Sequence, residues 1–322
     1  MKTVDIIVPC FNEEEVIDLF FEETSKVVGR IESYSFRYIF VDDGSRDKTL
    51  EKLMALGELH DNVKYLSFSK NFGKEAAMYA GLSYSKSDYA IIMDADLQHP
   101  PALIPQMIEG IEQGYDCCAA QRTSRQGESK VRSFFARLYY KLSNIFTNVD
   151  LVQGAVDYRI MTRQMVNAVL DLSERQRFSK GIFAWVGFKT KWIPYENVER
   201  MAGNSKWNFL SLFKYAIDGI TAFSVTPLRT VTFVGSLISG FAFIYIIVII
   251  LQTMIWGIDV PGYVTTLCAV LFLGGIIELS IGILGEYVAH IYVEIKGRPI
   301  FILKNTNMNL VDEIECEDHN HE

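Results

Sequence analysis

The stretch Asp88-Tyr89-Ala90-Ile91-Ile92-Met93-Asp94-Ala95-Asp96-Leu97-Gln98-His99-Pro100 decides how this chain folds. Its apolar run is typical of a buried strand, and the run stops at two aspartates spaced i, i+2. On extended chain this spacing puts both carboxylates on one side. Neighbouring carboxylates raise each other's pKa unless a cation lies between them. The oxygen ligands of Asp94, Asp96 and Gln98 suit Mg²⁺ or Mn²⁺; the alternative is a turn with two solvated acids.

Short apolar runs alternate with helical segments around this stretch. We expect strands at Val4–Val8, Tyr38–Val41, Val63–Ser67, Tyr89–Met93, Cys117–Ala120, Asp157–Met161 and Lys189–Pro194. We expect helices at about 12–31, from about Asp47, and at Gly73–Ser85, Pro101–Gln113 and Phe178–Val186. Asn12 and Glu15 fit a capping box for the first helix. The alternation predicts an α/β domain with a mainly parallel, doubly wound sheet, in which Pro9, Asp43 and Asp94 converge at strand carboxyl ends.

Charge and cysteine content exclude some classes of protein. The formal net charge is −8, and the acidic residues between 312 and 322 contribute six of those charges, in a tail that we expect to be disordered. The rest of the chain is nearly balanced, so no nucleic-acid partner is predicted. The five cysteines show no spacing typical of zinc sites or disulfide frameworks.

A basic, aromatic segment follows the first strands. Arg122, Arg125, Lys130, Arg132, Arg137 and Lys141 are interleaved with phenylalanines and tyrosines. This pattern fits either a solvated helix face or a cationic wall beside lipid headgroups. The amphipathic segment Trp207–Phe223 is likewise either a packed helix or a helix lying in the membrane interface.

Two long apolar segments follow. Residues 230–258 carry no charge, and a second apolar segment from Tyr263 to about Ile291 contains only Glu278 and Glu286. Each is long enough to cross a membrane. Lys and Arg flank the pair but are absent from its turn, which predicts that the catalytic part and both termini are cytoplasmic, at the inner or plasma membrane. Glu278 and its neighbouring glycines would suit packing between copies in a homo-oligomer.

These features predict four parts of the chain. They are a catalytic domain at residues 1–206, an interfacial helix region at 207–228, two transmembrane helices at 229–292 and a cytoplasmic tail at 293–322.

The combination of motifs resembles a known family. The chain looks like a family 2 glycosyltransferase with a GT-A fold, of the polyprenyl-phosphate group that includes bactoprenol glucosyltransferases and dolichyl-phosphate mannose synthases. The matching segments are Ile7-Val8-Pro9-Cys10-Phe11-Asn12-Glu13, Val41-Asp42-Asp43-Gly44-Ser45, Asn71-Phe72-Gly73-Lys74-Glu75-Ala76-Ala77, Asp94-Ala95-Asp96-Leu97-Gln98 and the loop from Glu199-Arg200 to Ser205-Lys206.

The resemblance implies roles for particular residues. The nucleotide base and ribose would be surrounded by Pro9, Phe11, Glu13, Val41 and Asp43. The diphosphate and its metal would lie along Asp94, Ala95, Asp96 and Gln98, beneath Arg200 and Lys206. Arg122, with Arg132 or Arg137, would hold the lipid phosphate, and Asp157 would lie near the acceptor. The catalytic residues would therefore be Asp157, Asp96 and Arg122. A purely structural role remains an alternative for Asp157, and so does a structural ion pair for Arg200 and Lys206.

The implied reaction is an inverting transfer of a hexose from a nucleotide sugar to a polyprenyl phosphate such as undecaprenyl phosphate. Transfer would occur at the cytoplasmic membrane face and would supply a lipid-linked sugar for cell-envelope glycosylation. Glucose and a UDP-sugar are favoured; N-acetylglucosamine, galactose and GDP-mannose are alternatives. A processive synthase is a further alternative, although Gln176-Arg177-Phe178 departs from the Gln-x-x-Arg-Trp motif of such enzymes. A membrane scaffold with a degenerate nucleotide fold is the alternative outside enzymes.

Overall fold

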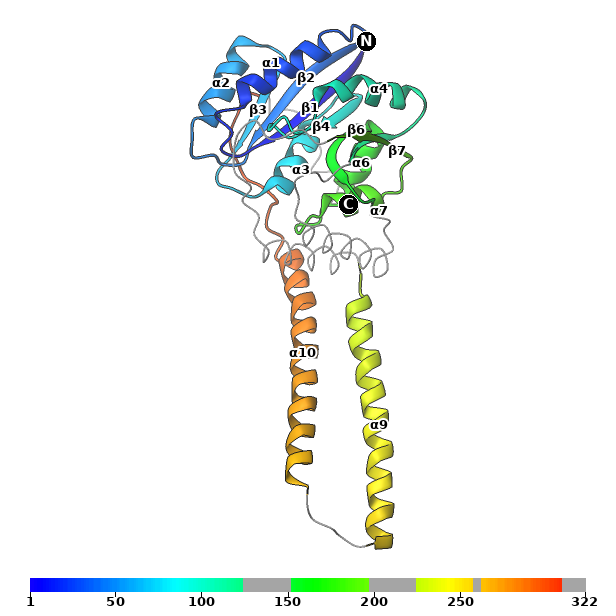
Figure 1. Cartoon of the computed structure of the whole chain (residues 1–322). Coiled ribbons are helices and arrows are strands. Elements are labelled where there is room, and N and C mark those ends of the chain that lie inside the picture. The colour runs from blue at the N-terminus through cyan, green and yellow to red at the C-terminus, as the bar shows by residue number, and fades with distance from the viewer. Residues whose placement is uncertain (124–151, 197–223, 257–261, 309–322) are drawn as a thin grey trace, which may run out of the picture.

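A computed structural model of the chain describes residues 1–123, 152–196, 224–256 and 262–308. Within these residues, an α/β domain stands above two long helices that extend from one side of it (Figure 1). The predicted class, a mainly parallel sheet followed by a pair of long apolar helices, is confirmed. The amphipathic segment Trp207–Phe223, and all of the basic segment after Thr123, lie outside the described residues.

The described strands form a single mixed sheet in the order β7-β5-β6-β4-β1-β2-β3-β8. Their bounds are β1 Lys2–Cys10, β2 Tyr34–Asp42, β3 Val63–Phe68, β4 Tyr89–Ile92, β5 Cys117–Arg122, β6 Ala155–Thr162, β7 Thr190–Tyr195 and β8 Leu303–Thr306. Strands β4, β1, β2 and β3 are parallel neighbours, and β5 is parallel to β7. Strand β6 runs antiparallel to both β4 and β5.

Helices cover both faces of the sheet. The helices α1 (Ile17–Val28), α2 (Thr49–Leu59) and α4 (Ile104–Glu112), the last preceded by the 3-10 turn η1 (Pro101–Leu103), pack in one core cluster. The helices α3 (Lys74–Tyr84), α6 (Arg163–Asp171) and α7 (Ser179–Trp185) pack in the other. Ile6 belongs to the first cluster and Ile7 to the second. Alternate residues of the central strand β1 are therefore buried on opposite faces of the sheet, which explains why its sequence is a continuous apolar run.

The first helix begins later than predicted, and the prediction of a capping box at Asn12 and Glu15 is wrong. Helix α1 begins at Ile17, whereas Asn12 has a left-handed backbone with φ of 56°. The Asn12 amide donates to the Ser45 hydroxyl at 2.9 Å, and its side-chain oxygen accepts from the Arg46 amide at 2.9 Å. Asn12 therefore joins the loop after β1 to the loop after β2 instead of capping a helix.

The chain after the second long helix returns to the sheet, which the sequence did not predict. Strand β8 pairs antiparallel with β3, and this places Leu303–Thr306 inside the α/β domain although they belong to the predicted tail at 293–322. The ring of Phe301 stacks on Phe68 with centroids 5.1 Å apart. The Asn307 side chain accepts from the Tyr65 amide at 2.8 Å and donates to the Val63 carbonyl at 3.1 Å.

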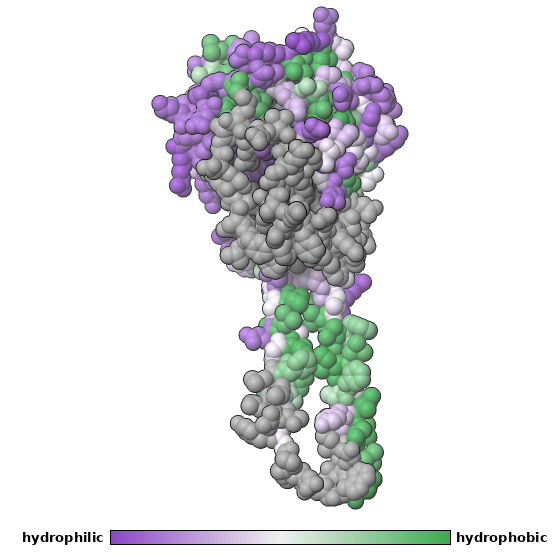
Figure 2. Space-filling model, in the orientation of Figure 1, coloured by the Kyte–Doolittle hydropathy of each residue, from purple (hydrophilic) through white to green (hydrophobic). Residues whose placement is uncertain are grey.

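The helices α9 (Thr226–Trp256) and α10 (Tyr263–Ile295) are both long and apolar enough to cross a membrane, judged by length and composition. Their described side chains are largely exposed and form the green stalk in Figure 2. Near the domain, Glu294 of α10 accepts from the Arg175 amide at 2.7 Å, and the Tyr287 hydroxyl donates to the Ser224 carbonyl at 2.6 Å. The first contact attaches α10 to the α/β domain, and the second joins α10 to the residues just before α9.

Replacement of Gly81 by alanine should destabilise the α/β domain. A Cβ at Gly81 of α3 would collide with the Ile7 side chain of β1. Overpacking of a core typically costs about 1–3 kcal/mol. We expect a lower denaturation midpoint for Gly81→Ala than for Ser83→Ala, because the Ser83 hydroxyl donates to the Tyr79 carbonyl within its own helix. Equal midpoints would show that the α3–β1 contact is not close.

Candidate functional site

The carboxyl ends of three parallel strands meet at one edge of the sheet. Pro9 of β1 is in register with Val41 of β2, and Ile7 of β1 with Ile92 of β4. The predicted convergence of Pro9, Asp43 and Asp94 is therefore present in the structure. Phe11 and Glu13 follow β1 at the same edge and are partly buried. Val41 is fully buried in the core, and its contact with a nucleotide stays a prediction.

Asp43 holds the loop that precedes helix α3. Its buried carboxylate accepts from the Asn71 side chain at 2.8 Å, the Phe72 amide at 2.6 Å and the Gly73 amide at 2.9 Å. Burial raises the pKa of Asp43, although the two amides act in the opposite direction. The carboxylate thus has a structural role that sequence reasoning missed, and its contact with a nucleotide stays a prediction.

The Asp-x-Asp pair follows β4 at the same edge. Asp94 and Asp96 are partly exposed, whereas Ala95 and Leu97 between and after them are buried. Ala95 and Asp96 form a turn after β4, and Leu97 has φ of 55°, so the extended chain on which the spacing argument rested ends before the pair. Gln98 is also partly exposed, and its backbone N–H donates to the Asp96 carboxylate at 3.1 Å.

A lysine joins this pair to a second strand. The Lys74 ammonium, on the first residue of α3, lies 2.7 Å from Oδ1 of Asp94 and 2.9 Å from Oδ2. It also lies 2.8 Å from the Asp157 carboxylate of β6. Burial alone would raise the pKa of Asp157, but Lys74 and Lys180 hold that pKa far below its usual range. Asp157 is therefore ionised at neutral pH.

The antiparallel direction of β6 explains how Asp157 reaches this edge. Ile92, the last residue of β4, pairs with Arg159 of β6. Because β6 runs opposite to β4, its amino-terminal residues lie beside the carboxyl end of β4. Asp157 thereby joins Asp94 from a strand that begins, rather than ends, at this edge.

Two further side chains border the carboxylates. His99 is buried, stacks on Tyr158 with centroids 5.4 Å apart, and has its Nδ1 3.8 Å from an Asp94 oxygen. Burial lowers the pKa of His99, although the Asp94 carboxylate opposes this effect. Arg122 ends β5, and its Nε is buried without a hydrogen-bond partner in the described part of the chain.

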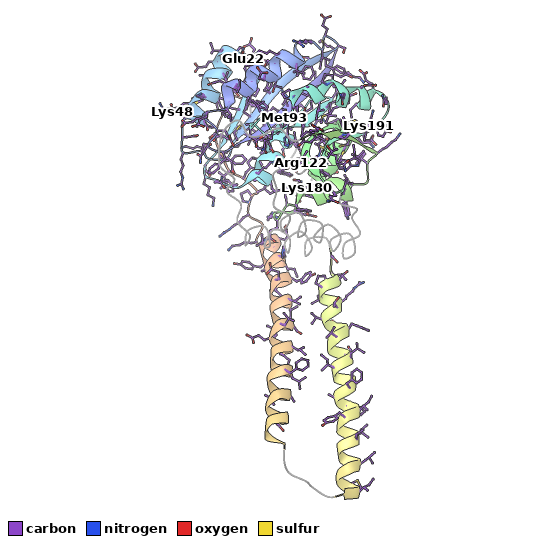
Figure 3. The ribbon with its side chains drawn as sticks, in the orientation of Figure 1. Glu22, Lys48, Met93, Arg122, Lys180 and Lys191 are labelled. Atoms are coloured by element: carbon purple, nitrogen blue, oxygen red, sulfur yellow. The ribbon has the colours of Figure 1, made fainter. Side chains whose placement is uncertain are left out.

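The side of the domain that bears Arg122 faces the long helices. Figure 3 shows Arg122 and Lys180 on the side nearer the hairpin, with Glu22 on the opposite side. A ligand held by Arg122 would therefore lie on the hairpin side of the domain.

The predicted metal ligands fit an incomplete oxygen site. Among the described residues, no three His, Cys, Asp or Glu side chains are grouped to hold a metal ion. Asp94 and Asp96 are both partly exposed, and Asp94 already contacts a cationic group, the Lys74 ammonium. A hard divalent cation bound by one or two carboxylates usually takes its other ligands from substrate phosphates and water, so the donor set fits Mg²⁺ or Mn²⁺ with a diphosphate.

The remaining predicted site residues lie outside the described chain; they are Arg132, Arg137, Arg200 and Lys206. Conversely, Lys74, Glu75 and His99 lie at the site without having been assigned a role. One feature of the sequence could have pointed to Lys74, namely a lysine at the start of a predicted helix. The helix dipole disfavours a positive charge there, so such a lysine suggests that carboxylates lie nearby.

Glu75, the residue after Lys74, links α3 to α7 beside the site. Its carboxylate accepts from the Ser179 amide at 3.0 Å and from the Ser179 hydroxyl, which joins α3 to α7. Burial, together with the neighbouring Asp157 carboxylate, raises the pKa of Glu75 to about 7, although the hydrogen bonds from Ser179 oppose the shift.

Comparisons with known proteins cover both parts of the chain. Residues 5–170 match the family described as Glycosyl transferase family 2, and residues 226–291 match the GtrB C-terminal hairpin. The Bacillus subtilis (strain 168) protein CsbB, named only as a glycosyltransferase, is 47% identical over 95% of this chain and 92% of its own. A prophage bactoprenol glucosyl transferase homolog of Escherichia coli (strain K12) is 40% identical over 94% of this chain and 98% of its own.

A solved structure also resembles the chain. It is glucosyl-3-phosphoglycerate synthase from Mycobacterium tuberculosis, with a TM-score of 0.45 and 17% identity, covering 68% of this chain and 78% of the other. At this TM-score and identity the likeness supports no inference about this chain.

Stability should depend on pH through Glu75. Its pKa rises from an ordinary 4.5 to about 7 in the folded chain, so the native state binds this proton more tightly than the unfolded state. The protonated Glu75 side chain therefore adds to the free energy of unfolding. This contribution is fully present below about pH 4.5 and is lost as the pH rises toward 7. Glu75→Gln lacks that loss, so its denaturation midpoint should rise relative to the unsubstituted protein between pH 5 and pH 8. Glu51→Gln, at an exposed position of α2, should run parallel to the unsubstituted protein; a parallel Glu75→Gln profile would contradict the shift.

Proposed function

Since the chain belongs to glycosyltransferase family 2, we propose that it transfers a hexose from a nucleotide sugar to a polyprenyl phosphate. Glucose and UDP are the favoured sugar and nucleotide. The reaction would take place at the cytoplasmic face of the membrane and would produce a lipid-linked sugar for cell-envelope glycosylation.

One observation carries this proposal. A family 2 domain and a GtrB-type hairpin occur in one chain, and that chain aligns over 94% of its length with a relative named as a bactoprenol glucosyl transferase homolog. Bactoprenol is a polyprenol, so its phosphate keeps an apolar tail in the bilayer. Two apolar helices, of which α10 bonds directly to the α/β domain, suit an acceptor of this kind.

The chemistry follows from the charges at the sheet edge. An oxygen of the lipid phosphate would attack the anomeric carbon, the bond from that carbon to the diphosphate would break, and its electron pair would leave on the diphosphate. A single direct displacement inverts the anomeric centre. A divalent ion bound near Asp94 and Asp96 would neutralise the departing diphosphate. Of the chain's own residues, Arg122 would bind the acceptor phosphate; its Nε has no hydrogen-bond partner among the residues that the structure describes.

Asp157 is better suited to orient the acceptor side than to act as a base. An efficient general base has a pKa near the working pH, whereas Lys74 and Lys180 hold the pKa of Asp157 far lower, against the effect of burial. A phosphate monoester is already largely ionised near neutral pH, since its second pKa is about 6. The nucleophile therefore needs little deprotonation, and a permanently charged Asp157 can position Lys74 and the groups around it.

The hairpin and the charges beside it support a location in the membrane. Both ends of the hairpin lie beside the α/β domain. Arg229 precedes the first span, and Lys296 and Arg298 follow the second. The distribution of positive charge supports a cytoplasmic catalytic domain in an inner or plasma membrane. The exposed apolar faces of the helices also leave room for association between copies of the chain.

The proposal can be tested by incubating purified protein with undecaprenyl phosphate, Mg²⁺ or Mn²⁺ and a panel of sugar nucleotides. The panel would contain UDP-glucose, UDP-N-acetylglucosamine, UDP-galactose and GDP-mannose. Mass spectrometry should detect a lipid monophosphate enlarged by one hexose with UDP-glucose. A product with another sugar would correct the donor, and no lipid product with any donor would refute the proposed function.

Asp96→Ala should abolish transfer while leaving the protein in the membrane. The substitution removes a proposed metal ligand at a partly exposed site of the α/β domain that is not part of either long helix. Membrane fractionation measures insertion, and the lipid product measures transfer. Undiminished turnover would remove Asp96 from the metal site.

Arg122→Gln should weaken use of the lipid acceptor more than use of the sugar nucleotide. Loss of a charge-assisted hydrogen bond to phosphate costs about 1.5–3 kcal/mol, so we expect KM for polyprenyl phosphate to rise about tenfold or more. The KM for the sugar nucleotide should change far less. If the two constants change equally, Arg122 does not discriminate the acceptor.

A further inference from the structure

The Lys74 ammonium neutralises one of the proposed metal ligands from within the chain. It contacts both oxygens of Asp94, at 2.7 and 2.9 Å, and shares its charge with Asp157 at 2.8 Å. A divalent ion that binds Asp94 must therefore share this carboxylate with the ammonium or displace it.

The position of Lys74 is set by the backbone. Lys74 follows Gly73, and the amides of Phe72 and Gly73 are held by the Asp43 carboxylate at 2.6 and 2.9 Å. Gly73 has φ of 99°, a left-handed value that favours glycine. The first turn of α3 therefore starts from a fixed point, and the Lys74 side chain reaches the carboxylates from there. Its side chain is still 42% exposed, so a ligand can approach from the open side.

The Lys74 ammonium reduces the negative charge that a divalent metal ion meets at the site. Asp94, Asp96 and Asp157 supply three negative charges near the end of β4, and Lys74 supplies one positive charge in contact with two of them. Without a nucleotide, an incoming Mg²⁺ or Mn²⁺ meets a site whose nearest carboxylate is already paired. A diphosphate adds negative charge and oxygen ligands for the metal, and it is also a partner for an ammonium group.

We infer that Lys74 makes divalent metal binding depend on the nucleotide. The ammonium weakens the binding of metal to Asp94 while the site is empty of nucleotide, and the diphosphate relieves this competition by attracting the metal and the ammonium together. This inference rests on the proposed function, because it takes the diphosphate of a sugar nucleotide as the second ligand. Metal and nucleotide are then thermodynamically coupled, and each strengthens the binding of the other by the same factor.

The test is a Mn²⁺ titration of the purified full-length protein in detergent, followed by the electron paramagnetic resonance signal of free Mn²⁺, with and without UDP. Binding that persists in Asp96→Asn is assigned to other acidic groups and subtracted. In the unsubstituted protein, UDP should strengthen Mn²⁺ binding about tenfold or more. In Lys74→Met, Mn²⁺ should bind about tenfold more tightly without UDP, and the enhancement by UDP should shrink by a similar factor.

Three controls separate the possible outcomes. Lys74→Arg keeps the charge and should keep the dependence on UDP, and Lys74→Gln repeats the neutral substitution if the methionine variant does not fold. Lys52→Met removes a lysine that pairs with Asp18 on the surface of α1 and α2, and should match the unsubstituted protein. Unchanged nucleotide-free Mn²⁺ binding in a folded Lys74→Met or Lys74→Gln variant would overturn the inference and leave the proposed function intact. If the unsubstituted protein binds no Mn²⁺ even with UDP, both the metal assignment and the inference fail.

Discussion

The hydrogen bonds of the Asp43 carboxylate are the constraint on which the site depends. This buried group follows β2 and accepts from the loop that leads into α3. A glycine is needed beside it, because a Cβ at Gly44 would collide with the backbone of Lys70. The two loops are thereby held in contact, and helix α3 starts where its first side chain can reach Asp94 and Asp157. A structural carboxylate thus positions the cation of the site.

The mixed sheet brings the remaining charges to one edge and joins that edge to the hairpin. A wholly parallel sheet would place only strand ends there, whereas the reversed strand β6 contributes Asp157 from its beginning. At one end of the strand order, β8 pairs with β3 a few residues after α10 ends. The contact of Glu294 with Arg175 adds a second attachment. Both attachments hold α10 and the chain that follows it against the α/β domain.

Much of the fold could be predicted because it rests on local pattern. Each predicted strand is present within a few residues of its expected bounds, since runs buried on both faces stand out in the sequence. The start of α1 could not be predicted from a capping pattern, because Asn12 bonds to a loop more than thirty residues away. Strand β8 could not be predicted either, since Leu303–Thr306 is a short edge strand whose pairing partner is distant in the chain.

By itself, the sequence determined the class of the domain, the two long apolar helices and the Asp-x-Asp pair at the end of β4, because periodicity and composition are local properties. Only the tertiary structure decided that Lys74 lies between Asp94 and Asp157. Those three residues come from the start of α3, from the turn after β4 and from β6, and their meeting depends on strand order and direction. Strand order follows from the packing of the whole sheet, which no single stretch of sequence encodes.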